Sequence, residues 1–70
     1  MRTWIYEYPT GERGEEHCRE TITDDEILED CWDWWKLAME NKYGKGSPKI
    51  TKENCIRDWV TTNWAWEDKK

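Results

Sequence analysis

The sequence predicts a small α+β domain in which three strands and two helices follow the order β-β-α-α-β. Two patterns carry this prediction: apolar side chains alternate with polar ones near both ends of the chain, and they recur at helical spacing in between. The third observation is length, because 70 residues suffice for one domain at most. We therefore expect a single domain over residues 1–70, with a three-stranded antiparallel sheet, both helices on one face of the sheet, and a core rich in tryptophan.

The first two strands are predicted near the N-terminus. Over residues 3–9 the side chains alternate, so that Trp4, Tyr6 and Tyr8 point to one side of the strand. A polar turn with two glycines follows. Residues 17–22 then form a plausible return strand, which would pair with the first as a hairpin.

The last strand is predicted over residues 61–67, where the period changes from helical spacing back to alternation. Its two tryptophans, Trp64 and Trp66, lie on one face of that strand. Pairing with the first strand would bring them near Trp4 and Tyr6.

The first helix has the clearest local signal in the chain. Thr23 at the N-cap and Glu26 three residues later form a capping box, and Ile22 and Ile27 are placed as a hydrophobic staple. A glycine follows Tyr43, so the helix is expected to end there.

The faces of this helix differ sharply in chemistry. At 100° per residue, the apolar stripe consists of Ile27, Cys31, Trp34 and Ala38, flanked by Leu28, Trp35 and Met39. The opposite face is acidic and consists of Glu26, Glu29, Asp30, Asp33 and Glu40. Leu37 lies in the middle of the acidic face, and Trp32 lies at its border.

A second helix is predicted over residues 51–60. Thr51 is its N-cap, because it follows a break at a glycine, serine and proline and precedes residues at helical spacing. Its apolar face consists of Cys55, Ile56, Trp59 and Val60.

Charge is distributed unevenly along the chain. The net charge is −5, but residues 12–33 carry ten acids against two arginines, whereas residues 34–60 carry six bases against three acids. The acidic half disfavours direct binding to a nucleic-acid backbone. It favours a basic surface on another protein, because opposite charge speeds and selects the encounter.

Seven tryptophans and three tyrosines are an unusual share for so short a chain. A small domain cannot bury much surface, and a buried Trp removes about 150–250 Å² from water. We therefore interpret most of these rings as core. Trp32, Tyr43 and Tyr8 are the ones we expect to remain partly exposed.

No pattern in the sequence indicates a metal, a cofactor or an active site. The candidate metal ligands are His17, Cys18, Cys31 and Cys55, but none form the closely spaced pairs of structural zinc sites. Three cysteines, an odd number, argue against a disulfide framework. The only histidine, His17, is followed by Cys18, but adjacency in sequence does not bring this thiol within reach of the imidazole. We expect no enzymatic activity, no cofactor and no metal.

The N-terminal residues lack the apolar run of a signal peptide, and no stretch is long enough to span a membrane. We therefore expect no membrane association and a reducing cytoplasm as the location.

Two segments, DDEILEDCWDWW and ENCIRDWVTTNWAWE, resemble small uncharacterised proteins of T4-like marine cyanophages. The resemblance covers most of the chain and transfers no functional residue. It implies a small phage protein made in the cytoplasm of a bacterial host.

These observations together predict a non-enzymatic protein-interaction module, phage-encoded, that modulates or inhibits a host protein with a basic surface. The predicted contact residues are Glu26, Glu29, Asp30, Trp32, Asp33 and Leu37. A first alternative is a module that binds a small ligand on exposed aromatics, with Trp4, Tyr6, Trp64 and Trp66 as the wall. A second alternative is an acidic mimic of nucleic acid. The chain is expected to be a monomer or a homodimer.

Overall fold

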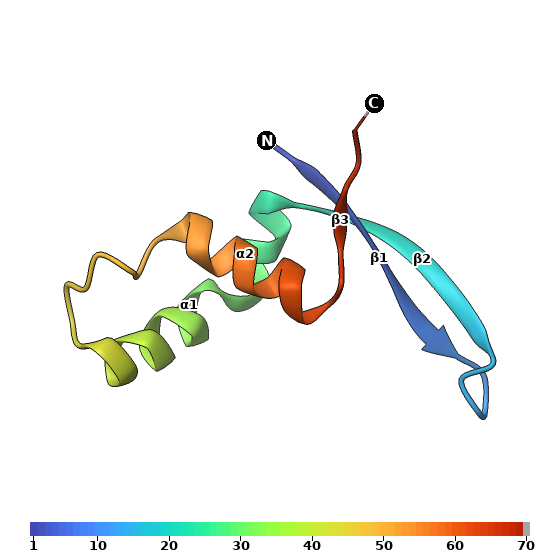
Figure 1. Cartoon of the computed structure of the whole chain (residues 1–70), viewed down its shortest axis with the longest axis horizontal. Helices are drawn as coiled ribbons and strands as arrows, with labels where there is room; N and C mark the ends of the chain where they lie inside the picture. Colours follow the sequence, from blue (N-terminus) through green and yellow to red (C-terminus); the bar gives the residue numbers. More distant parts are fainter. Residues whose placement is uncertain (70) are drawn as a thin grey trace.

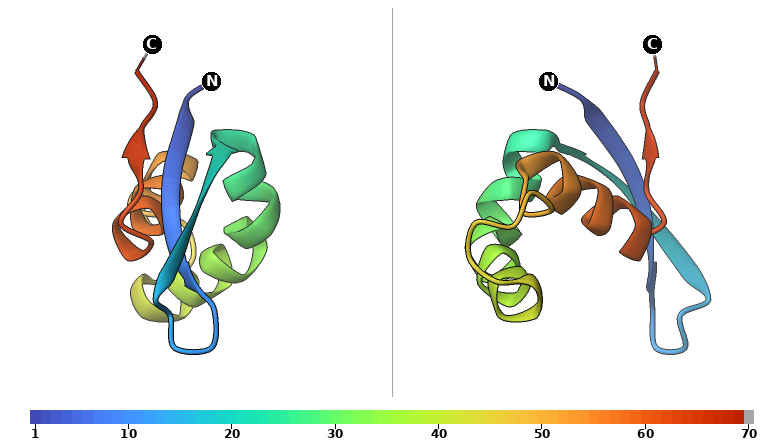
Figure 2. Two further views of the ribbon diagram at one scale, coloured as in Figure 1. Left: turned by 90° about the vertical axis from the view of Figure 1, so that its right-hand side faces the viewer. Right: turned by 60° about the vertical axis from the view of Figure 1, so that its left-hand side comes forward.

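The computed structural model describes residues 1–69, and Figure 1 shows their arrangement. The elements in chain order are β1 (Thr3–Thr10), β2 (Glu16–Thr23), α1 (Asp24–Tyr43), α2 (Lys52–Thr62) and β3 (Trp66–Glu67). The three strands form one antiparallel sheet in the order β2-β1-β3. Both helices lie on one side of this sheet (Figure 2). The predicted α+β fold is therefore confirmed.

The last strand is shorter than predicted, because the second helix runs further. α2 extends to Thr62, and the Ala65 amide donates to the Val60 carbonyl at 2.9 Å. Trp64 has a positive φ of 55°, so the backbone turns at this residue instead of extending. Only Trp66 and Glu67 remain to pair with β1.

The register of the hairpin decides which side chains face the helices. Trp4 lies opposite Ile22, and both pack against the core. Tyr6 is on the same face of β1, and its ring meets Trp59 of α2 edge to face, with centroids 5.3 Å apart. Ile5 lies opposite Trp66, so these two side chains share the other face of the sheet.

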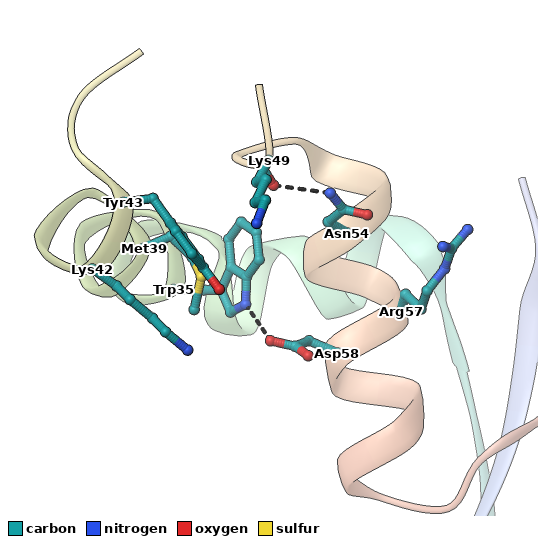
Figure 3. A pocket seen from close by; sticks show the side chains of 8 residues that line it. All are labelled: Trp35, Met39, Lys42, Tyr43, Lys49, Asn54, Arg57 and Asp58. Atoms are coloured by element: carbon teal, nitrogen blue, oxygen red, sulfur yellow. Dashed lines mark hydrogen bonds between the residues drawn. The ribbon is translucent and has the colours of Figure 1, made fainter. Parts of the chain in front are cut away.

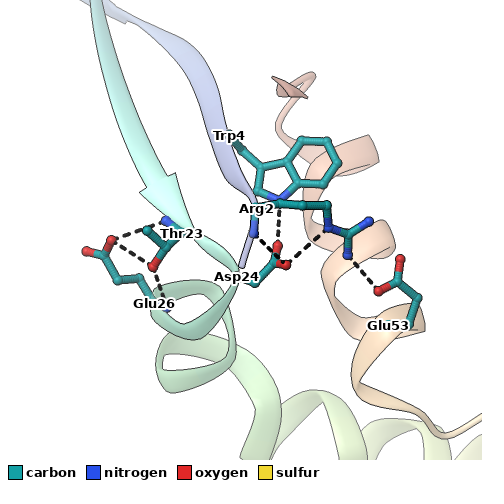
Figure 4. Close-up of polar contacts among 6 residues, drawn as sticks. All are labelled: Arg2, Trp4, Thr23, Asp24, Glu26 and Glu53. Carbon is teal, nitrogen blue, oxygen red and sulfur yellow. Dashed lines mark hydrogen bonds and ion pairs between the residues drawn. The ribbon is translucent and has the colours of Figure 1, made fainter. Parts of the chain in front are cut away.

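The beginning of α1 is held by its own cap and by contacts from two other elements (Figure 4). The predicted capping box is present: the Glu26 amide donates to the Thr23 hydroxyl, and the Thr23 amide donates to the Glu26 carboxylate. Asp24 accepts hydrogen bonds from the Trp4 indole at 2.7 Å and from the Arg2 guanidinium at 3.1 Å. Arg2, the second residue before Trp4, also donates to Glu53 of α2, so its side chain links the start of α1 to α2.

The core lies where α1 crosses α2. Its buried members are Ile27, Cys31 and Trp35 of α1 and Cys55 and Ile56 of α2. Of the seven tryptophans, Trp35 is buried in this core. Trp4, Trp32 and Trp59 are partly buried and pack against the core. The Trp-rich core is thus built from these four rings, while Trp34, Trp64 and Trp66 are exposed.

The buried stripe of α1 differs from the predicted one in its second half. Trp34 and Ala38 were expected in the core, but Trp34 is 62 % exposed and Ala38 is also exposed. Trp35, expected at the flank, is only 5 % exposed. The reason is that α2 packs along the row of α1 residues spaced four apart, which rotates steadily around the helix.

The described part of the chain is elongated, with extents of 42 × 31 × 16 Å. Its radius of gyration is 14.2 Å, against about 11 Å for a compact domain of this length. The far half of the hairpin projects beyond the helices (Figure 1). Within residues 1–69, neither helix has the length and apolar character that crossing a membrane requires.

Candidate partner-binding site

The exposed side of α1 carries a stripe of acidic side chains. Glu26, Asp30, Asp33 and Leu37 recur every three or four residues, so they lie next to one another along the helix. All four are exposed, and the Leu37 side chain is 60 % exposed. Glu29, also exposed, lies beside this stripe. The structure therefore presents the predicted carboxylates and the predicted leucine on one accessible surface.

Most of these carboxylates have no cationic partner among residues 1–69. Over residues 1–69, the ion pairs join Arg2 to Asp24 and Glu53, and Arg19 to Glu7. Glu29, Asp30 and Asp33 are in none of them. Glu26 differs, because its carboxylate closes the capping box and so has a structural role.

A concavity of about 490 Å³ lies beside this stripe, between α1, β1 and α2. Glu26, Glu29 and Asp30 line one side of it, and Tyr6 and Trp59 line the other. Burial, the hydrogen bond to Glu20 and nearby carboxylates, in that order of size, raise the pKa of Tyr6. Aromatic rings next to free carboxylates suit the ammonium or guanidinium group of a basic side chain.

A second concavity, of about 320 Å³, follows between α1 and α2. Asp30 and Trp59 line both hollows, so the two hollows adjoin at these residues. The second part is mainly apolar, lined by Trp34, Ala38 and Met39. The surface formed by the two hollows thus changes from acidic to apolar along its length. We call this combined surface the α1 groove.

Trp34 is the functional candidate that sequence reasoning missed. Trp32 was predicted at the contact surface, but it stacks on Trp35 at 5.9 Å, is half-buried, and lines neither part of the α1 groove. Trp34 is the exposed indole next to Asp30. The sequence contained a usable signal, since Trp34 lies four residues after Asp30.

The predicted aromatic wall does not form. Trp4 and Tyr6 face the helices, whereas Trp66 lies opposite Ile5 on the other face of the sheet. Trp64 precedes β3 and is 87 % exposed. Antiparallel pairing in this register therefore separates Trp66 from Trp4 and Tyr6, and Trp64 lies outside the sheet.

Basic residues gather at the opposite end of the helix pair (Figure 3). A hollow of about 430 Å³ is lined by Trp35, Met39, Lys42, Tyr43, Lys49, Asn54, Arg57 and Asp58. The ammonium groups of Lys42 and Lys49 lie 5.2 Å and 4.6 Å from the centroid of the Tyr43 ring. The single carboxylate, Asp58, accepts a hydrogen bond from the Trp35 indole at 2.8 Å.

The candidate metal ligands are dispersed. His17 and Cys18 are neighbours on β2 and so point to opposite faces of the sheet, while Cys31 and Cys55 are buried between the helices. In the described part of the chain, no three His, Cys, Asp or Glu side chains come together as a metal site.

Comparison with protein-family models, curated proteins and solved structures gives no match for this chain.

Proposed function

We propose that this chain is a small non-enzymatic protein-interaction module, encoded by a phage, that modulates or inhibits a host protein. The partner presents a basic surface that also carries an apolar side chain. The α1 groove is the contact site.

The observation that supports this proposal most directly is that the acidic and apolar hollows of the α1 groove adjoin at Asp30 and Trp59. Its acidic part offers the carboxylates of Glu29 and Asp30, which no cation within residues 1–69 neutralises. Its apolar part offers the exposed indole of Trp34. A partner with a lysine or arginine near a leucine-sized side chain would satisfy both parts at once.

The physical roles of the two parts differ. Exposed carboxylates at a rim mainly speed the encounter and exclude acidic partners. A tryptophan covered on binding contributes a large apolar area and belongs to the residue types enriched in interface hot spots. Inhibition then follows from occlusion, since the bound module covers the basic surface of its partner.

The test is capture from a lysate of the bacterial host with four baits. They are the native chain, a Glu29→Lys/Asp30→Lys variant, Trp34→Ala, and a control Glu12→Lys/Glu16→Lys variant. The control residues are exposed at the hairpin turn, far from the α1 groove, and their reversal changes the net charge by the same amount. Far-UV circular dichroism confirms that each bait is folded.

One host protein retained by the native and control baits, and lost with both groove variants, supports the proposal. A set of captured proteins that is identical for all four baits contradicts it. Loss from the control bait as well would show that only the overall charge matters. If the captured protein binds DNA or RNA, and nucleic acid displaces the module, the interaction is mimicry of nucleic acid.

A second candidate function is binding of a small anionic ligand in the basic hollow of Figure 3. The observation that favours it is that Lys42 and Lys49 lie against the Tyr43 ring, which is 44 % exposed, while Arg57 also lines the hollow. Cations suit a phosphate or carboxylate group, and the exposed ring suits a flat aromatic group.

Titration of Trp and Tyr fluorescence with adenosine monophosphate, and separately with inorganic phosphate, tests this second candidate. Lys49→Met is expected to weaken binding, whereas Lys45→Met is the matched control, since Lys45 is exposed and does not line the hollow. No saturable signal with either compound, or equal loss in both variants, contradicts it.

A further inference from the structure

The two buried cysteines form a close pair that sequence spacing did not reveal. Cys31 of α1 and Cys55 of α2 have their Sγ atoms 3.4 Å apart. Their exposed fractions are 2 % and 0 %. Cys18 is exposed on β2 and has no part in this contact.

The pair also lies at the wall of a surface hollow. Cys31 and Cys55 both line the apolar part of the α1 groove, together with Trp34, Trp35 and Trp59. Cys31 is 2 % exposed and Cys55 is 0 % exposed, so we expect a molecule as small as a peroxide to reach Cys31 first, through a small local movement of the surrounding side chains. The surrounding rings exclude larger reagents.

We propose that Cys31 and Cys55 form a redox-active dithiol that closes to an intramolecular disulfide between α1 and α2 when the chain meets a hydroperoxide. An S–S bond is about 2.0 Å long, so the sulfur atoms must approach from 3.4 Å by about 1.4 Å. Rotation of the two side chains with a small shift of the helices supplies this movement. The inference does not depend on the proposed partner binding.

The chemistry balances with the peroxide as the only co-reactant. One thiolate attacks a peroxide oxygen, the O–O bond breaks, and the cysteine becomes a sulfenic acid while the departing hydroxide takes up a proton as water. The second cysteine, as its thiolate, attacks that sulfur, forms the S–S bond and releases a second hydroxide, which is also protonated to water. The two thiols together lose two electrons, and the peroxide gains them.

Burial makes oxidation of this cysteine pair slow. Burial, followed by the contact with Cys31, raises the pKa of the Cys55 thiol to about 12. Thiolate is therefore scarce at neutral pH, and the rate of oxidation is expected to rise with pH. Such a pair stays reduced in a reducing cytoplasm and closes under sustained oxidative stress.

Closure has a measurable effect on stability, because it joins two positions that are 24 residues apart. A crosslink of this span restricts the unfolded chain, and an increase in melting temperature on the order of 10–30 °C is expected. Reduction with dithiothreitol should restore the original melting temperature.

The experiment starts from fully reduced protein treated with excess hydrogen peroxide, first under native conditions and then in strong urea. Free thiols are counted after denaturation, the intact mass is measured, and the linked peptides are identified by mass spectrometry. The Cys18→Ser variant is the control in which Cys31 and Cys55 are the only cysteines left. Linked peptides are mapped on the native chain too, so the result does not rest on the folding of a variant.

The expected result is loss of the mass of two hydrogen atoms, linkage of Cys31 to Cys55, and one free thiol at Cys18. In urea the same treatment should give mixed pairings, because the fold no longer selects the pair. Three free thiols after native treatment, oxygen adducts without linkage, or the same mixture in both conditions would each overturn the proposal.

Discussion

Substitution of the neighbouring residues Trp34 and Trp35 tests the position of the core most directly. Trp35 is 5 % exposed and Trp34 is 62 % exposed, although the two are adjacent on α1. Replacement of a buried tryptophan by alanine typically costs about 3–5 kcal/mol. A chain of 70 residues is stable by only about 4–10 kcal/mol in total, so Trp35→Ala should leave much of the protein unfolded.

Two milder substitutions make the comparison quantitative. Trp35→Phe keeps an aromatic ring but loses the hydrogen bond from the indole to Asp58, which is 2.8 Å long, and we expect a cost of about 1–2 kcal/mol. Trp34→Ala should change the free energy of unfolding by less than about 1 kcal/mol, because the exposed ring contributes little and alanine has the higher helix propensity.

Urea unfolding followed by far-UV circular dichroism measures these differences without relying on tryptophan fluorescence. The slope of the free energy against urea concentration should be unchanged in the folded variants, so that shifts in midpoint report stability. The reasoning fails if Trp34→Ala is as destabilising as Trp35→Ala. That result would place Trp34 in the core, as the simple helical stripe had predicted, and would remove it from the α1 groove.

Three further predictions concern the cap, the N-terminal network and one tyrosine. Thr23→Ala should cost about 1 kcal/mol through loss of the capping box, seen as a melting temperature about 4–8 °C lower. Desolvation alone would raise the pKa of Asp24, but hydrogen bonds from Trp4 and Arg2 outweigh it and hold that pKa below 3.8. Its stabilising contribution should therefore be complete above about pH 4 and lost as pH falls through the lower folded-state value, so Asp24→Asn should reduce the pH dependence of stability below that point. The hydrogen bond to Glu20, followed by desolvation, raises the pKa of Tyr8 to about 12, and an absorbance titration of Glu20→Gln should show this pKa returning toward 10.

Local sequence was sufficient for most of the secondary structure. The start of α1 at Thr23 and its end at Tyr43 follow from a capping box and a glycine, which act within a few residues of one another. The β1–β2 hairpin follows from alternation in the same way. The end of α2 could not be predicted from local sequence, because the turn at Trp64 depends on how the chain returns to β1.

Local sequence likewise predicted one part of the candidate site and not the other. The acidic stripe of α1 was visible in the sequence, since residues three or four apart on a helix are neighbours whatever surrounds them. The α1 groove was not, because it needs Tyr6 of β1 and Trp59 of α2 to lie against that helix.

The contact of Cys31 with Cys55 was equally hidden, as it joins residues 24 positions apart. Which of Trp34 and Trp35 is buried also depended on the row of α1 that α2 packs along. Short-range hydrogen bonds and periodicity are determined by neighbouring residues. Which faces of the helices and strands meet is determined by packing between elements that are distant in the chain.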